Sequence, residues 1–260
     1  MSADACVERL ARTPRLLVAL DFDGTLAPLA DRPMTARMTP AAKDAVTALV
    51  ATPDTAVALV SGRSLHDLRE IAEHRLDSRL HLAASHGAEY WHPGDPAEPA
   101  PAADPAALRL RDELRARAEQ VVADLEGVWI EPKAVGFALH TRLASDADTV
   151  AAHEAIGALM TAEAPDWRTR TGRDILEFAS RHEGKDTAVA ALRSLVDATA
   201  VLFAGDDVTD EDALRSLGPD DLGVRVGAGE TAATLCVPDI AALASLLTDL
   251  ADRRARAARE

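Results

Sequence analysis

The chain has 260 residues, of which 48% are hydrophobic, so it can bury the core of one large domain or of two modest ones. Its formal net charge of -15 and its 3% content of aromatic residues argue against a nucleic-acid partner and against an anionic membrane surface. The two cysteines, Cys6 and Cys236, form no CxxC pair or Cys/His cluster, so we expect neither a zinc site nor a disulfide framework. No apolar segment approaches the roughly 20 residues of a membrane span. Residues 1–15 have no apolar signal-peptide region, so we expect a cytoplasmic location.

Short apolar runs predict the strands of a doubly wound α/β domain. They lie at residues 16–21, 56–62, 80–87, 200–207 and 222–227. Several are apolar without alternation, which is typical of parallel strands that are buried on both faces. Helical patterns lie between them, at residues 39–51, 64–74 and 184–196. Thr39 followed by Pro40 predicts the N-cap and first turn of the first of these helices.

The middle of the chain has a different pattern. Residues 92–106 hold five prolines and predict a linker or boundary loop. Two helical patterns follow it, and each precedes a segment of strand character, in the order 108–127, 127–142, 145–163 and 167–180. This order predicts a small α+β domain inserted into the first one. We therefore expect a core domain of residues 1–104 and 181–260 and a cap domain of residues 105–180.

Two details of the cap and the chain end follow from local pattern. Residues 135–142 alternate, so Phe137 and Leu139 fall on one face of a strand, and His140 and Arg142 fall on the other. We expect the hairpin turn before this strand to pass through residues 131–134. The last residues, 252–260, are expected to be a frayed and solvated helix end.

The strongest motif is DFDGTLAP, at residues 21–28, directly after the first apolar run. Asp21 and Asp23 are two residues apart, so their side chains leave the same face of an extended segment, and Gly24 permits a sharp turn out of the sheet. Carboxylates at the carboxyl end of a buried strand lie where open α/β sheets bind ligands. Such a pair needs a cation or a shared proton to offset its charge. An Asp-rich turn that caps the next helix is the alternative interpretation.

A second acidic motif, GDDVTDED at residues 205–212, also follows an apolar run. Helix capping explains Glu211 and Asp212, because acidic residues in a first turn favour the helix dipole. It explains poorly why Asp206, Asp207 and Asp210 crowd the same strand-to-helix turn. Carboxylate oxygens at two strand ends are ligands that suit Mg²⁺.

Two further groups lie beside predicted strand ends. Ser61, in the SGR string at 61–63, and the amide after it could bind a phosphate oxygen, although Ser-Gly is also an ordinary turn signal. Lys185 begins a predicted helix, where the dipole disfavours a cation unless an anion is bound; a solvated lysine is the alternative. All four residue sets fall at one edge of the predicted sheet, so we expect a single site.

In order and spacing, DFDGT, Ser61, Lys185 and GDD resemble the four motifs of the haloacid dehalogenase superfamily of phosphohydrolases, over the whole chain. The resemblance implies a Rossmann-like core with an inserted type 2 cap, and Mg²⁺ as cofactor. It implies that Asp21 is the nucleophile, that Asp23 is the general acid/base, and that Ser61 and Lys185 hold the phosphoryl oxygens. The implied metal-binding residues are Asp21, Asp23 through its carbonyl, and Asp206, with Asp207 and Asp210 supporting the metal's waters.

Within that superfamily the chain resembles the trehalose-6-phosphate phosphatases. The strings that carry this resemblance are DFDGTLAP, SGR, SHGAE (85–89), EPK with ALHTR (131–142), ILEF (175–178) and GDDVTDED. The chain departs from the family's pattern at Thr141, where an aromatic residue is usual, and at Ala213-Leu214, where Phe is usual. The implied substrate-binding residues are Gly62, Arg63, Glu131, Lys133, His140, Arg142 and Glu177. The implied partner is a sugar phosphate, and the implied state is a monomer that can associate with a trehalose-6-phosphate synthase.

Several alternatives remain at this point. Glu131 and Lys133 could form a turn ion pair of little energetic value, and we expect His66 and His86 to be structural or solvated. The substrate could be another disaccharide phosphate or a trehalose-like aminocyclitol phosphate, and a phosphomutase would use similar motifs. A non-catalytic sugar-phosphate sensor belongs to a different class, but a pure binder does not need a nucleophile and an acid.

Overall fold

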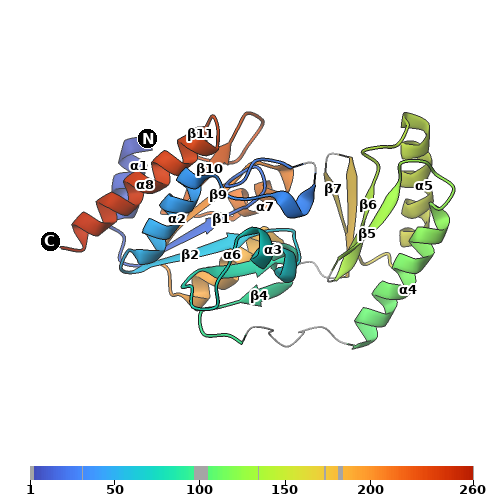
Figure 1. The fold of residues 1–260 in the computed structure, drawn as a ribbon, viewed down its shortest axis with the longest axis horizontal. Helices are drawn as coiled ribbons and strands as arrows, with labels where there is room; N and C mark the ends of the chain where they lie inside the picture. The colour runs from blue at the N-terminus through green and yellow to red at the C-terminus, as the bar shows by residue number, and fades with distance from the viewer. Residues whose placement is uncertain are drawn as a thin grey trace. The chain divides into compact units, whose positions relative to one another are not determined.

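The computed structural model describes residues 3–30, 32–96, 105–133, 135–172, 174–180 and 184–259. The chain divides into two compact units (Figure 1). Met1–Pro99 and Glu183–Glu260 form the first unit, and Ala100–His182 form the second. Residues 97–104 of the predicted linker lie outside the described residues. Among the helices that are described, none combines the length and the apolar character that crossing a membrane requires.

The first unit is built on a seven-stranded sheet in the order β11-β10-β9-β1-β2-β3-β4. Every neighbouring pair is parallel except β3 and β4. The strands are β1 (Leu16–Leu20), β2 (Thr55–Val60), β3 (His81–Ala84), β4 (Glu89–Trp91), β9 (Ala200–Gly205), β10 (Leu222–Val226) and β11 (Leu235–Val237). Strands β1 and β9 are buried along their whole length, as their unbroken apolar sequences predict. The predicted doubly wound α/β core is therefore confirmed.

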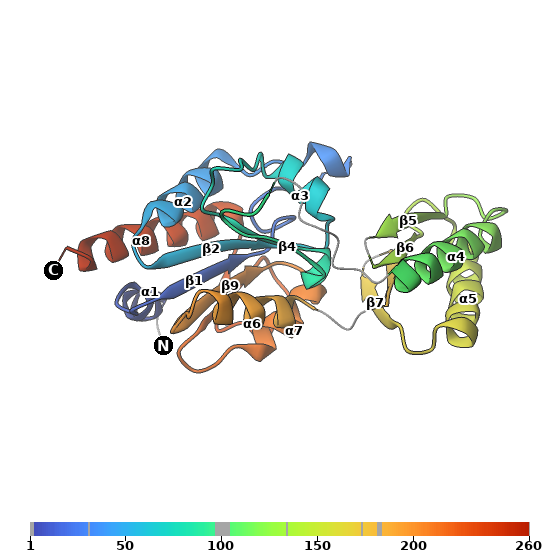
Figure 2. The same cartoon turned by 90° about the horizontal axis from the view of Figure 1, so that it is seen from below.

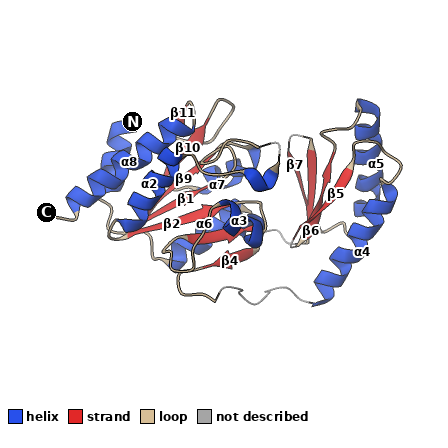
Figure 3. Cartoon of the chain, viewed as in Figure 1, coloured by secondary structure: helices blue, strands red, loops and turns tan. Residues whose placement is uncertain are grey.

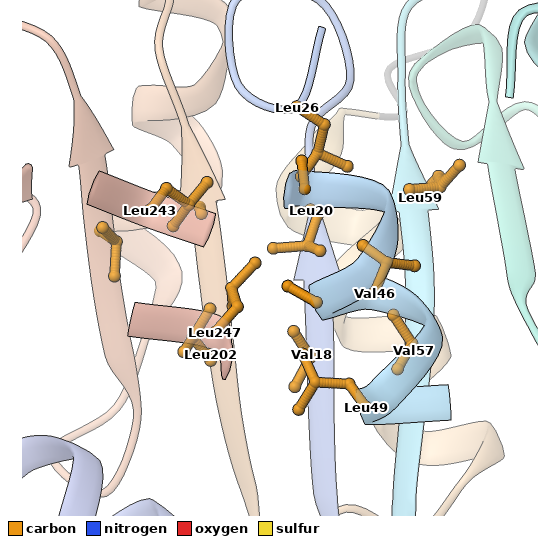
Figure 4. Close-up of a cluster of buried hydrophobic side chains, with 14 of the residues drawn as sticks. Val18, Leu20, Leu26, Val46, Leu49, Val57, Leu59, Leu202, Leu243 and Leu247 are labelled. Atoms are coloured by element: carbon orange, nitrogen blue, oxygen red, sulfur yellow. The ribbon is translucent and has the colours of Figure 1, made fainter. Parts of the chain in front are cut away.

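Helices cover both faces of this sheet (Figures 1 and 2). They are α1 (Ala3–Ala11), α2 (Pro40–Ala51), α3 (Leu65–Ile71), α6 (Lys185–Leu195), α7 (Glu211–Ser216) and α8 (Ile240–Ala257). On one face, Val18 of β1 belongs to a buried cluster with Leu49 of α2 and Leu247 of α8 (Figure 4). On the other face, Leu17 belongs to a cluster with residues of α6 and α7. Each residue of β1 thus packs into one of two apolar layers, which makes this strand the centre of the core.

Local sequence signals define one helix well and the end of another poorly. Helix α2 begins at Pro40, and the Thr39 hydroxyl accepts a hydrogen bond from the Ala42 amide (3.3 Å), as predicted. The expectation of a solvated end at residues 252–260 was wrong for Arg254, which is buried in the last turn of α8. Its guanidinium donates to backbone carbonyls at the end of α1 and in the turn before β2. Those acceptors come from distant parts of the chain, so the sequence around Arg254 does not reveal them.

The second unit is an α+β domain, as predicted. Its sheet is antiparallel throughout, in the order β5-β6-β8-β7. The strands are β5 (Trp129–Lys133), β6 (Gly136–His140), β7 (Arg168–Gly172) and β8 (Ile175–Ala179), and the helices are α4 (Pro105–Val121) and α5 (Asp146–Glu163). Both helices cover the same face of the sheet (Figure 3). Phe137 and Leu139 pack there against Leu114 of α4 and Ile156 of α5, so the predicted alternation of this strand is confirmed.

Two expectations for the second unit were wrong. The hairpin turn does not pass through residues 131–133, because β5 continues to Lys133 and pairs with β6; residue 134 lies outside the described residues. Pro132 is tolerated in this strand because β5 is at the edge of the sheet, where a missing N–H breaks no ladder hydrogen bond. Strand β6 ends at His140, so Arg142 does not share its face and lies exposed in the following turn.

Candidate active site

The site begins where β1 ends, at the centre of the first unit's sheet. The Asp21 amide donates to the carbonyl of Ala204 at the end of β9 (2.9 Å). From β1 and β9 the chain adds strands outward in opposite directions, and ligands bind open α/β sheets beside the carboxyl ends of such a strand pair. Gly24 has a φ of +83°, and a Cβ atom there would lie 2.0 Å from the Asp206 carboxylate. Glycine therefore lets the DFDGT turn approach the acidic loop after β9.

Lys185 joins two buried carboxylates. Its Nζ donates to Oδ1 of Asp21 and to Oδ1 of Asp210, both at 2.6 Å. Lys185 and Asp210 are 3% and 0% exposed. Burial alone lowers the pKa of Lys185, but the charges and hydrogen bonds of the two carboxylates outweigh it and raise that pKa above its usual value. The two carboxylates thus favour the charged ammonium and offset its unfavourable position at the start of α6.

Three carboxylates form an acidic cluster around this lysine. Oxygens of Asp21, Asp206 and Asp210 all lie within 4.8 Å of one another. Thr25 Oγ1 donates to Asp21 (3.0 Å) and to Asp206 (3.3 Å). Burial raises the pKa of Asp206 to about 6, with a further contribution from Asp210. Burial also raises the pKa of Asp21 well above its usual value, against the opposing charge of Lys185.

This cluster fits a divalent cation. Three carboxylates and one ammonium leave two negative charges in a largely buried space. A hard cation with oxygen ligands would offset that charge and return the raised pKa values toward their usual range. Asp21 and Asp206 are the residues best placed to hold Mg²⁺, because Asp210 is fully buried and its second oxygen already accepts two backbone amides.

The structure places Asp207 at the margin of this cluster, not within it. Its side chain is exposed and accepts a hydrogen bond from the Val208 amide (2.6 Å), so it caps the short helix η3 (Val208–Asp210) and does not join the acidic cluster. Asp210 lies under the loop instead, and its Oδ2 accepts the amides of Asp206 and Asp207, both at 3.0 Å. A Cβ at Gly205 would lie 2.2 Å from the Asp210 carboxyl, so glycine permits this arrangement. Asp210 therefore shapes the loop that presents Asp206.

The second carboxylate of DFDGT has a partner of its own. Arg63 binds Asp23 through two hydrogen bonds, Nε to Oδ2 at 2.6 Å and Nη2 to Oδ1 at 2.7 Å. This bidentate geometry fixes the orientation of the carboxylate as well as its charge. Ser61 is buried just beyond β2, and its Oγ accepts the Arg63 amide (3.2 Å). The SGR string thus forms a loop, residues 61–63, that contacts the DFDGT turn.

In the second unit, polar side chains gather on the sheet face opposite α4 and α5. Glu131, Ala138, Glu177 and Arg170 are directly paired across the four strands and therefore share this face. Glu131 binds Lys133 (2.9 Å) and His140 Nε2 (2.7 Å).

Electrostatics and an aromatic stack complete this polar face. Burial would raise the pKa of Glu131, but the hydrogen bond from His140 and the charge of Lys133 outweigh it and lower the pKa to about 2. The Trp129 ring stacks on His140 with centroids 4.7 Å apart. Trp129 and Arg170 were not predicted as site residues, although the alternation within residues 168–172 contained a usable signal for Arg170.

The comparisons with known proteins agree with this geometry. The family model described as Trehalose_PPase, trehalose-phosphatase, matches residues 19–235. The chain belongs to the trehalose-phosphatase family. A bifunctional trehalose-6-phosphate synthase/phosphatase from Thermoproteus tenax is 32% identical over 96% of this chain and 34% of that protein. A trehalose-phosphate phosphatase from Mycobacterium marinum is 31% identical over 82% of this chain and 54% of its own length. The chain thus spans between a third and just over half of the length of these curated relatives.

Solved structures of the trehalose-phosphatase family share the fold. The C-terminal domain of a C. albicans trehalose-6-phosphate phosphatase matches with a TM-score of 0.78 and 20% identity, over 97% of both chains. A haloacid dehalogenase-like hydrolase from B. subtilis matches with a TM-score of 0.60 and 15% identity, over 89% of this chain and 98% of that chain. The expected architecture, a haloacid dehalogenase-type core with an inserted domain, is confirmed by these matches.

Proposed function

We propose that this chain is a Mg²⁺-dependent phosphatase that hydrolyses trehalose 6-phosphate to trehalose and phosphate through an aspartyl-phosphate on Asp21. One observation carries the proposal: Lys185 and the carboxylates of Asp21, Asp206 and Asp210 form one buried cluster at the carboxyl ends of β1 and β9. Its place in the trehalose-phosphatase family supports the choice of substrate. A sensor without catalysis would have no use for a nucleophile buried beside a lysine.

In the proposed mechanism, Mg²⁺ held by Asp21 and Asp206 would supply positive charge that offsets the charge of the phosphoryl group. Asp21 forms a bond to phosphorus in line with the sugar oxygen, and the bond from phosphorus to that oxygen breaks. Asp23 gives a proton to the departing oxygen and later takes one from the water that attacks the aspartyl-phosphate. That attack releases phosphate and restores Asp21. Lys185 and Ser61 hold phosphoryl oxygens, and Arg63 orients Asp23 in the resting site.

We also propose that residues 1–104 and 181–260 are the catalytic core and that residues 105–180 supply sugar recognition. Glu131, Lys133, His140 and Glu177 lie on one polar face, which suits a ligand rich in hydroxyl groups. Arg142 stays in this proposal as a contact from the adjoining turn. Gly62 and Arg63 are proposed to contact the phosphate end.

The proposed setting of the enzyme is a cytoplasmic monomer without nucleic-acid or membrane partners. The Thermoproteus tenax relative is named as a bifunctional synthase and phosphatase, which supports association of this chain with a trehalose-6-phosphate synthase.

The test is phosphate release by the purified chain, with Mg²⁺ or with EDTA, from trehalose 6-phosphate, sucrose 6-phosphate, glucose 6-phosphate and glucosyl-3-phosphoglycerate. We expect strong preference for trehalose 6-phosphate and loss of turnover in EDTA. Asp21→Asn should abolish turnover, and near-native activity in that variant would contradict the aspartyl-phosphate. Lys133→Ala should mainly raise KM, whereas Lys43→Ala, at an exposed surface pair, should change neither constant. If the chain cleaved an artificial aryl phosphate but none of these four compounds, the proposed mechanism would stand and the substrate assignment would fail. Pseudodisaccharide phosphates would then be tested as substrates.

A further inference from the structure

Three consecutive residues beyond β3 have left-handed backbone conformations. Ser85, His86 and Gly87 have φ angles of +48°, +56° and +97°. Only glycine adopts this region without a steric penalty, so Ser85 and His86 are strained. Such strain persists where the surrounding structure holds it in place, and it clusters at functional sites. The segment belongs to the SHGAE string, in which we expected His86 to be structural or solvated.

The 61–63 loop holds this segment in place. The Ser85 amide donates to the Arg63 carbonyl (2.7 Å), and the His86 amide donates to the Ser61 carbonyl (3.0 Å). The Ser85 hydroxyl donates to Glu89 (2.5 Å), and the same carboxylate oxygen accepts the Leu65 amide just beyond the loop (3.2 Å). Strands β2 and β3 are parallel neighbours, so the two segments leave the sheet side by side. The strained residues therefore connect directly to the loop proposed to bind phosphate.

The His86 ring makes a second contact with this loop. A Cβ atom built on Gly62 would lie 2.5 Å from Nε2 and 2.7 Å from Cε1 of His86. The imidazole thus fills the space that a side chain at Gly62 would need. The ring and the two backbone hydrogen bonds together limit movement of Ser61 and Arg63. Those two residues carry the buried hydroxyl and the guanidinium that binds Asp23.

We propose that the Ser85-His86-Gly87 segment is a strained brace and that His86 is a positioning residue for phosphate binding by the 61–63 loop. This inference rests on the proposed phosphatase function and adds a residue to it. The strain is explained by the position that the segment gives the loop, because its two strained residues are the ones whose amides hold Arg63 and Ser61. The amides of Ser85 and His86 both hold the loop by hydrogen bonds, and the His86 ring packs against Gly62.

The experiment compares His86→Asn and His86→Gly with wild type. Both replacements adopt a left-handed backbone conformation readily but lack the imidazole. They therefore test the contribution of the ring without changing the conformation of the turn. Asp197→Gly is the matched control, because Asp197 is a left-handed residue (φ +49°) that precedes β9, at the opposite end of that strand from Asp206. Three quantities are measured in the full chain: the Tm, the KM and kcat for trehalose 6-phosphate, and the Kd for inorganic phosphate with Mg²⁺.

We expect both His86 variants to melt within about 2 °C of wild type. Their KM and their Kd for phosphate should rise about tenfold or more, because small displacements of binding groups weaken binding by factors of this size. Asp197→Gly should leave both binding constants unchanged.

Two results would overturn the inference. One is phosphate affinity within twofold of wild type in both His86 variants, and the other is a large loss of Tm in His86→Gly, which would show that the segment is not strained. If wild type hydrolyses no sugar phosphate, the proposed function fails, and the phosphate affinities still test the brace. A wild type that binds no inorganic phosphate would refute both.

Discussion

Replacing Asp210 and Asp207 separately by asparagine tests which of these neighbouring residues belongs to the site. Asp210 uses one oxygen for the Lys185 ammonium (2.6 Å) and the other for two backbone amides (3.0 Å each). An asparagine has one acceptor oxygen, so its NH₂ group must face either the ammonium or the two amides. One set of buried donors is then left without an acceptor.

The expected cost follows from this loss. Breaking a buried ion pair destabilises a protein by roughly 3–5 kcal/mol. Because Lys185 keeps its bond to Asp21, we expect a loss of unfolding free energy at the lower end of this range, about 3 kcal/mol, for Asp210→Asn. Asp207→Asn keeps the acceptor for the Val208 amide at an exposed position, so we expect a change of less than about 0.5 kcal/mol. Activity should fall about 100-fold or more for Asp210→Asn, because the loop that presents Asp206 is disturbed. For Asp207→Asn it should fall less than about tenfold.

Urea unfolding, followed by circular dichroism at pH 7.5, measures the stabilities of both variants. Phosphate release from trehalose 6-phosphate measures their activities in the same buffer. The reasoning is refuted if Asp207→Asn loses as much activity as Asp210→Asn, or if Asp210→Asn is as stable as wild type. The first result would return Asp207 to the metal site that the sequence suggested.

Two other changes test stability elsewhere in the first unit. Burial and the neighbouring His92 lower the pKa of His81 from 6.5 to about 4. Between these two values the unfolded state binds more protons than the folded state, so the free energy of unfolding decreases as the pH is lowered. Because His81 is only partly buried and solvent screens its interactions, we expect this group to remove about 1 kcal/mol of unfolding free energy between pH 7.5 and pH 5. Urea unfolding at both pH values should show a smaller loss in His81→Gln, and an equal loss would contradict the assignment. Arg254→Met should lower the free energy of unfolding by about 3 kcal/mol or more, because buried carbonyls lose their donor. The same change at the exposed Arg256 should lower it by less than about 0.5 kcal/mol. Similar midpoints of urea unfolding for the two variants would show that those carbonyls are hydrated instead.

Much of the site could be predicted because it depends on a property that parallel strands share. The carboxyl ends of β1, β2 and β9 lie at one edge of a sheet, so groups that follow separate apolar runs must meet there. Asp21, Ser61 and Asp206 were selected on this basis, and the structure brings Asp21 and Asp206 into one cluster. The strand order could not be read from the runs themselves, but any doubly wound order preserves that edge.

Residues whose roles depend on turn conformation could not be predicted. The string GDDVTDED does not show which aspartate points inward, because this depends on the conformation of the η3 turn. In the structure that turn folds Asp210 beneath the loop and leaves Asp207 exposed. Pro132 looks like a turn residue until its strand is known to be at a sheet edge. In each case the role of the residue depends on the conformation of its segment or on the strand order, and neither is visible in the residue types.

The sequence by itself determined the architecture and the chemical character of the site, because hydrophobic periodicity and the spacing of carboxylates act locally along the chain. Only the tertiary structure placed His86 against Gly62 and Arg254 against the carbonyls at the end of α1. These contacts join residues 24 and 244 positions apart. Their partners are backbone atoms and a glycine, which carry no side-chain pattern, so they become visible only when the chain is folded.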